Sequence, residues 1–300
     1  MIPDLGTKTG AATLSVASNT VLIALKVAAG AITGSIAIIT EAIHSSIDLL
    51  ASVVALISVR RADVPADAEH PYGHEKVENL ASAIEGVLIL LGAWIIVFEA
   101  TRRLVVGAEI ETLGVGIAVV AFSAAANWGV SSWLYARARA LQSPALEGDA
   151  AHLRTDAFTS LGVLVGLLLV EITGAVAFDS IVALIVAVAI VVAGIRILTR
   201  SSRVLVDEAP PPEELDRIEA AIAAARPPEV VGYHKLRARR AGARRHIDLH
   251  VQFRSGTTLE RAHELRGAIE VEFPTADVLI HVEPEESAMA VEEDQPLRHG

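Results

Sequence analysis

Long apolar runs separated by short polar connectors fill the first two thirds of the chain. A helix needs about 20 mostly apolar residues to cross a bilayer, and six of the runs reach this length. They lie at about 12–32, 36–59, 79–101, 113–135, 144–170 and 177–199. The pattern predicts a multi-pass α-helical membrane protein, with six transmembrane helices at residues 12–206 after a cytoplasmic N-terminal segment at 1–11.

Basic residues predict the orientation of these helices. If both termini are cytoplasmic, the outer connectors contain only Arg102 and Arg103 as basic residues. The inner connectors then contain Lys8, Arg60, Arg61, Lys76, Arg137, Arg139, Arg200 and Arg203. This asymmetry follows the positive-inside rule and predicts a cell (inner) membrane protein with both termini in the cytoplasm. The N-terminal residues do not have the pattern of a cleavable signal peptide, so none is expected.

The composition changes after Arg203, and Pro210-Pro211-Pro212 end one helix and begin another. The following residues predict a helix, two strands, a helix and a strand at 213–226, 229–240, 244–254, 258–273 and 276–283. This order is typical of a two-layer α+β fold and predicts a C-terminal cytoplasmic domain at 207–284. Its core is small, so we expect dimerisation to support it. The acidic, polar tail at 285–300 is expected to be disordered.

Composition and charge narrow the class of function. The chain is 52% hydrophobic and has a mean hydropathy of +0.49, too apolar for an ordinary soluble domain. Residues 207–300 carry 19 acidic and 12 basic side chains, and contribute −7 of the net charge of −11. That acidity argues against nucleic acid as a partner. The chain has no cysteine, so a bound metal would need His, Asp, Glu, carbonyl or water ligands.

The same spacing pairs a histidine with an aspartate in the second and fifth apolar runs: His44 with Asp48, and His152 with Asp156. Positions i and i+4 share one face of a helix, and ionisable groups at membrane depth usually mark an ion pathway. Both pairs fall near the middle of a hydrocarbon core about 30 Å thick. Facing each other, they would offer zinc two imidazoles and two carboxylates. Alternatively, each pair is a satisfied polar contact between helices.

The connector between the second and third runs holds Asp67, His70 and His74 in a loop that contains proline and glycine. The loop could bring these three side chains around one ion. A solvated polar loop is the alternative, and the spacing alone does not separate the two interpretations.

Histidines also gather in the C-terminal domain. His246, Asp248 and His250 alternate along one predicted strand and share a face, as do His281 and Glu283 on the last strand. Two further candidates, at the start of a neighbouring strand and on the second helix, are His234 and His263. Such side chains can bind zinc, although an exposed polar sheet face would show the same pattern.

Other polar residues within the spans are assigned no transport role. Ser18, Asn19 and Asn127 are expected to form interhelical hydrogen bonds. The ammonium group of Lys26 is expected to extend towards a membrane interface.

Taken together, these features resemble the cation diffusion facilitators, which are proton-coupled exporters of zinc and related divalent metals. The resemblance covers residues 10–284. It rests on H-x-x-x-D in the second and fifth spans, the HPYGHEKVE loop, the six spans and an αββαβ domain similar to a metallochaperone. It implies a homodimeric antiporter in the lipid bilayer that exports a divalent metal from the cytoplasm in exchange for protons. Zn²⁺ would be the transported substrate and also a regulatory ligand.

The resemblance also implies roles for individual residues. The family's transport site corresponds to His44, Asp48, His152 and Asp156. The loop site of some bacterial members corresponds to Asp67, His70 and His74. Cytoplasmic metal positions correspond to His234, His250, His263 and His281, with Glu283 where a bacterial relative has Asp, whereas His246 lies outside the pattern. Lys76 and Asp207 correspond to a charge pair that holds the family's dimer together. Many bacterial members have Asp in place of His44, and the histidine form resembles the zinc-transporter subgroup that discriminates against manganese and, in part, cadmium.

Other classes of function fit the sequence less well. An intramembrane metalloprotease would need H-E-x-x-H, which the chain lacks, so no enzyme activity is expected. A passive channel would favour weak or multiple sites over one deep tetrahedral site. The alternatives that stay open are an exporter of broader specificity for Zn, Cd, Co, Fe and Mn, and a membrane metal sensor that does not transport. The prediction that the protein exports metal rather than taking it up rests on the resemblance.

Overall fold

The computed structural model describes residues 4–33, 36–106, 114–175 and 177–285. Contacts within the chain divide it into two units, Met1–Ser202 and Arg203–Gly300. The side chains of a few helical residues, His44 among them, lie outside the described part, as do residues 286–300 of the tail for which disorder was predicted.

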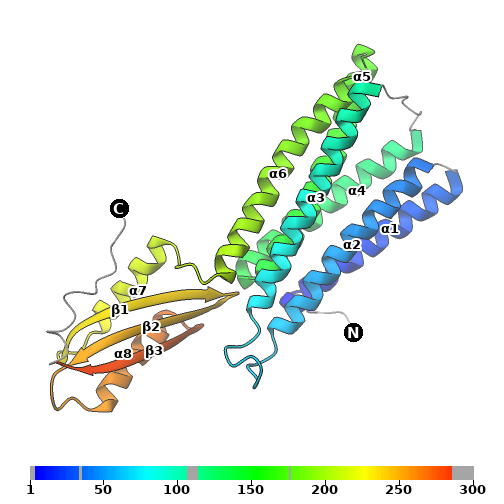
Figure 1. The fold of residues 1–300 in the computed structure, drawn as a ribbon. Coiled ribbons are helices and arrows are strands. Elements are labelled where there is room, and N and C mark those ends of the chain that lie inside the picture. The colour runs from blue at the N-terminus through cyan, green and yellow to red at the C-terminus, as the bar shows by residue number, and fades with distance from the viewer. Residues whose placement is uncertain (1–3, 34–35, 107–113, 176, 286–300) are drawn as a thin grey trace. The chain divides into compact units, whose positions relative to one another are not determined.

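Six long helices in the described residues build the first unit (Figure 1). They are α1 (Lys8–Thr33), α2 (Ile36–Ala62), α3 (Lys76–Val106), α4 (Gly114–Leu141), α5 (Pro144–Thr173) and α6 (Ala177–Leu205). By length and composition, α1, α3, α4, α5 and α6 can each cross a membrane, as judged from the described residues. α2 coincides with the predicted span at 36–59. The prediction of a multi-pass helical membrane domain is confirmed.

Small residues and one buried ion pair hold this bundle together. Ala81 of α3 and Ala145 and Ala150 of α5 are almost fully buried in one core cluster, because small side chains allow helices to approach closely. Glu78 of α3 is fully buried and accepts from the Lys8 ammonium at 2.5 Å and from the Ser143 hydroxyl. This carboxylate therefore ties α1 and the start of α5 to α3.

The second unit is the predicted α+β domain. Its elements are α7 (Pro212–Ala225), β1 (Val230–Ala241), β2 (Arg244–Phe253), α8 (Leu259–Glu272) and β3 (Ala276–Pro284). The strand order is β1-β2-β3, with β1 and β2 antiparallel and β2 and β3 parallel. The order and type of the elements agree with the sequence prediction.

Alternation along β2 separates the core of this domain from its polar face. Ile247, Leu249 and Val251 are buried with Ile222 of α7 and Ile269 of α8. Because successive side chains point to opposite faces of a sheet, the residues between them, including the one at position 250, face away from that core.

The strand register places three histidines side by side on the polar face. His234 of β1 is paired with His250 of β2, which is paired in turn with His281 of β3. The β1–β2 register shifts between His234 and Arg237, where Lys235 has a φ of +51°. This irregularity is typical of a β-bulge, which changes the direction of the side chains around it.

Candidate metal centres

The first cluster lies between α2 and α5. Asp48, His152 and Asp156 each offer a ligand atom, and these atoms lie within 4.8 Å of one another. Nε2 of His152 is 3.3 Å from Oδ1 of Asp48, and both residues are 6% exposed. The two α5 residues are one helical turn apart and so share a face. The structure thus brings together three of the four residues predicted for the transport site. The side chain of His44, one turn before Asp48 on α2, lies outside the described part.

This cluster suits a divalent cation. Two carboxylates and an imidazole nitrogen are ligand types that zinc accepts. Asp48 is buried and Asp156 is half-buried, and placing two such carboxylates side by side is costly unless a cation or protons offset their charge. An ion with a charge of +2 would balance both.

The second cluster lies in the loop between α2 and α3. His70 Nδ1 is 3.3 Å from Oδ1 of Asp67, and His74 Nε2 is 3.3 Å from Oδ2 of the same carboxylate. The backbone N–H of His70 donates to Asp67 at 2.7 Å. That hydrogen bond is the main cause that lowers the pKa of the Asp67 carboxyl, so the group is a charged ligand at neutral pH. The loop therefore gathers all three predicted residues.

A backbone contact sets the tautomer of His74. Its Nδ1 lies 3.2 Å from the carbonyl oxygen of Val64, and a carbonyl can only accept, so the proton is on Nδ1. In the neutral ring the buried Nε2 then faces Asp67 with a lone pair that a metal can bind. Fixing a histidine through its other nitrogen is a common feature of metal sites.

The third cluster lies on the polar face of the sheet and contains His234, His250 and Glu283. His250 Nδ1 is 2.7 Å from Oε1 of Glu283, and His234 Nε2 is 3.4 Å from Oε2. The hydrogen bond with His250 is the main cause that lowers the pKa of Glu283. Glu283, whose side chain is one methylene longer than that of aspartate, therefore reaches both imidazoles, with one carboxylate oxygen facing each.

The other histidines of this domain differ in placement. The ring of His281 lies beside that of His250, with centroids 4.5 Å apart and planes tilted by 45°, and its Nε2 is 3.8 Å from Oε1 of Glu283. His263 is exposed on α8 and is not part of the cluster in this protomer. His246 is buried and lies 3.5 Å from Asp277; burial is the main cause that lowers its pKa.

Family models match both parts of the chain. The model described as the cation efflux transmembrane domain matches residues 12–206, and the one described as the cation efflux protein cytoplasmic domain, ZT_dimer, matches residues 210–285. The chain belongs to the cation efflux family.

Relatives in this family match over most of their length. The uncharacterized transporter sll1263 of Synechocystis is 34% identical over 280 residues, or 91% of this chain and 89% of that protein. The uncharacterized transporter MJ0449 of Methanocaldococcus jannaschii is 32% identical over 256 residues, which cover 85% of this chain and 89% of that protein. The cation-efflux pump FieF of Klebsiella pneumoniae is 30% identical over 278 residues, which cover 91% of this chain and 92% of that protein.

Family membership establishes the general class of this protein. It is a multi-pass cation efflux transporter of divalent metals, not an enzyme. Its ZT_dimer cytoplasmic domain implies a homodimer.

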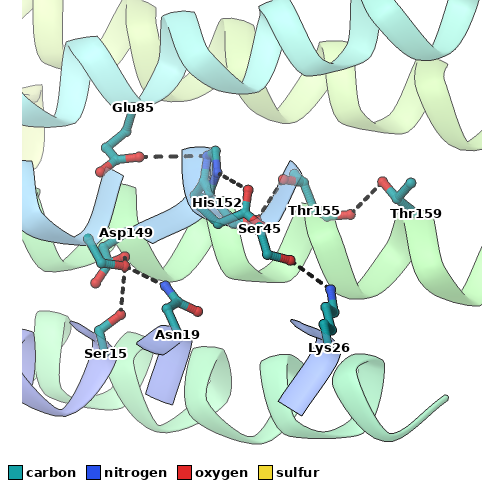
Figure 2. Close-up of polar contacts among 11 residues, drawn as sticks. Ser15, Asn19, Lys26, Ser45, Glu85, Asp149, His152, Thr155 and Thr159 are labelled. Atoms are coloured by element: carbon teal, nitrogen blue, oxygen red, sulfur yellow. Dashed lines mark hydrogen bonds and ion pairs between the residues drawn. The ribbon is translucent and has the colours of Figure 1, made fainter. Parts of the chain in front are cut away.

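Two buried carboxylates beside the membrane cluster were not singled out from the sequence of this efflux transporter. Glu85 of α3 and Asp149 of α5 are both fully buried. Asp149 accepts from Ser52 at 2.7 Å, and Ser52 in turn is bonded to Ser15 and Asn19 of α1. Figure 2 shows Glu85 and Asp149 near His152. An acidic residue inside an apolar span is the signal that could have found them.

Polar residues of α1 bear out one expectation about this transporter and contradict another. Asn19 donates to Ser52 of α2 at 2.8 Å, which is the interhelical bond expected of it. Lys26 was expected to extend towards an interface. Instead it is 4% exposed and donates to Ser45 of α2 at 2.7 Å (Figure 2). A hydroxyl on the neighbouring helix supplies a partner inside the bundle, so the ammonium group does not need to reach water.

Proposed function

We propose that this cation efflux transporter exports zinc from the cytoplasm in exchange for protons. The transport site would consist of His44, Asp48, His152 and Asp156. The observation that carries the proposal is the cluster of Asp48, His152 and Asp156 between α2 and α5, in which Asp48 and His152 are buried and Asp156 is half-buried.

Ligand chemistry supports zinc as the substrate. With His44 as the fourth ligand, the site offers two nitrogen and two oxygen donors, which suits tetrahedral zinc. Manganese prefers more oxygen ligands and octahedral coordination, and it lies at the weak-binding end of the divalent series.

The same ligands support exchange with protons. Zinc binds neutral imidazole and ionised carboxylate, so metal and protons compete for one set of atoms. The ordinary pKa of histidine, about 6.5, lies close to cellular pH, so a modest proton gradient can change its occupancy. In the proposed cycle, protons from outside displace zinc, and zinc from the cytoplasm displaces the protons.

We propose further that both termini are cytoplasmic and that the homodimer lies in the cell (inner) membrane. The positive-inside distribution of Lys and Arg supports this orientation. The proposed boundaries are a cytoplasmic segment at 1–11, a membrane domain at 12–206, a metal-binding dimerisation domain at 207–284 and a tail at 285–300.

The two clusters outside the bundle are proposed as auxiliary zinc sites. The loop set is Asp67, His70 and His74, and the cytoplasmic set is His234, His250, His263, His281 and Glu283. The close carboxylate–imidazole contacts in each cluster support the assignment. Because the exposed His263 and His281 have room to meet a second copy of the domain, zinc there would favour the dimer by mass action.

Metal flux into proteoliposomes tests the proposed function. Zn, Cd, Co, Fe and Mn are compared under a proton gradient that is acidic on the side towards which metal moves. We expect zinc flux that rises with the gradient and exceeds manganese flux. Zinc flux that ignores the gradient would exclude proton exchange, and equal rates for all five metals would favour the broader exporter. Zinc binding without flux would favour the sensor.

A further inference from the structure

A buried carboxylate lies at the second ring nitrogen of His152. Oε2 of Glu85 is 3.7 Å from Nδ1, whereas Nε2 of the same ring lies 3.3 Å from Oδ1 of Asp48. Figure 2 shows Glu85 of α3 facing the imidazole. His152 therefore stands between a carboxylate of the proposed transport site and one outside it.

Glu85 and His152 are each other's available partners. Neither carboxylate oxygen of Glu85 has a hydrogen-bond partner, and neither does Nδ1 of His152. Within the described residues, no lysine or arginine forms an ion pair with Glu85. Buried polar atoms in proteins are nearly always bonded. The distance of 3.7 Å between Nδ1 of His152 and Oε2 of Glu85 exceeds a normal N–H···O distance by only about 0.8 Å, which a small side-chain rotation can close.

The chemistry of imidazole gives this pairing a function. A neutral ring has one N–H and one lone pair, and a metal binds the lone pair. If Nε2 of His152 coordinates zinc together with Asp48, the proton must be on Nδ1. Histidines that ligate zinc almost always donate that second N–H to a carboxylate or carbonyl, which fixes the ring and raises its basicity.

We propose that Glu85 is a positioning residue of the transport site. It accepts the Nδ1–H of His152 and so holds the Nε2 lone pair towards Asp48 and Asp156. This inference rests on the proposed function, because it assumes that His152 is a metal ligand.

The packing of α3 against α5 brings Glu85 within reach. A Cβ added at Gly148 would lie 3.1 Å from Cβ and Cγ of Glu85 and 3.1 Å from Cα of Ser82, so Glu85 and the turn of α3 that carries it would have to move by a few tenths of an ångström. One oxygen of the neighbouring carboxylate, Asp149, accepts from Ser52 at 2.7 Å, whereas neither oxygen of Glu85 has a hydrogen-bond partner. Glu85 is thus the residue that glycine at 148 places beside His152.

Cobalt(II) absorption of the full-length chain tests the role of Glu85 without a flux measurement. The spectrum of a double variant, Asp48→Asn with Asp156→Asn, is subtracted to leave the signal of the membrane site. Glu85→Met removes the acceptor, and we expect cobalt affinity to fall about 10- to 100-fold with altered d–d bands. Glu85→Gln keeps an acceptor oxygen and should restore most of the affinity.

Two further variants make the result interpretable. Gly148→Ala pushes Glu85 and the adjoining turn of α3 away from α5 without changing a ligand. We expect it to weaken cobalt binding in the same direction, even if Glu85→Met does not fold. Glu147→Gln removes another carboxylate from α5, the helix of Gly148. Glu147 pairs with Arg200 at 2.5 Å, so its replacement should leave the cobalt affinity and the spectrum unchanged.

The outcomes separate this inference from the proposed function. If the double variant binds cobalt as the wild type does, the transport site itself is wrong. If the membrane-site signal exists but Glu85→Met and Gly148→Ala leave it unchanged, only the role of Glu85 is overturned. Equal losses in Glu85→Met and Glu85→Gln would also overturn it, because charge rather than an accepted hydrogen bond would then be responsible.

Discussion

Replacing Asp156 by asparagine tests the membrane site most directly. The change keeps the shape of the side chain and one oxygen but removes a negative charge from a buried cluster. Asp48 lies 3.3 Å from Nε2 of His152, so replacing Asp48 would directly disturb a second proposed ligand.

The expected magnitude follows from the dimensions of the cluster. The ligand atoms of Asp48, His152 and Asp156 lie within 4.8 Å of one another, so a bound ion lies no more than about 4 Å from each carboxylate. Two unit charges at about 4 Å attract by about 4 kcal/mol at an effective dielectric constant of about 20. Zinc carries two charges, but the amide oxygen and relief of desolvation offset part of the loss. We therefore expect a loss of about 4 kcal/mol, or roughly 1000-fold in zinc affinity.

Zinc uptake into proteoliposomes measures this effect as a function of zinc concentration. Asp156→Asn should show almost no flux at concentrations that saturate the wild type, while membrane insertion and dimer size stay unchanged. The control is Glu147→Gln. Glu147 lies on the same helix as Asp156, but its carboxylate contacts Arg200 instead of the cluster. Flux by Asp156→Asn within a few-fold of the wild type would remove this residue from the transport site.

Three further predictions concern the cytoplasmic site, selectivity and the dimer. Glu283→Gln should reduce the zinc-induced protection of the cytoplasmic domain from hydrogen exchange in the full-length protein; equal protection would exclude Glu283 as a ligand. The hydrogen bond with His250 holds the folded-state pKa of Glu283 below its ordinary value of 4.5, so the stabilisation is complete above about pH 4.5 and is lost as the pH falls through the lowered pKa. His44→Asp should keep zinc flux but gain cadmium or manganese flux with a shifted pH dependence, because a hard, charged oxygen replaces nitrogen; a wild type that already carries manganese would contradict this. Reversing the charge of Lys76 or Asp207 should weaken the dimer and reversing both should partly restore it, because a pair in a partly buried interface matters more than a surface pair; a double variant no better than the worse single one, by sedimentation and flux, would argue against the contact.

The sequence was sufficient for features that depend on the periodicity of a single element. Apolar runs of about 20 residues predict spans wherever they fall, and the αββαβ order follows from local patterns of hydrophobic residues. The spacing of His152 and Asp156 predicts a shared face because an α-helix repeats every 3.6 residues. The loop set at 67–74 is equally local, and the structure gathers its two histidines around the carboxylate of Asp67.

Tertiary structure alone decided which separate elements meet. Nothing in the spacing of α3 shows that Glu85 lies beside His152, because that contact depends on how closely α3 packs against Gly148 of α5. Likewise, Lys26 is inside the bundle because Ser45 of a neighbouring helix offers an acceptor.

Strand pairing decided the cytoplasmic cluster in the same way. Alternation places His246 and His250 on one face of β2, but only the register sets His250 between His234 and His281, while His246 lies against Asp277. Periodicity determines the face on which a side chain lies, because it is fixed by backbone geometry within one element. The partner of that side chain depends on packing between elements, which is specified by contacts far apart in the sequence.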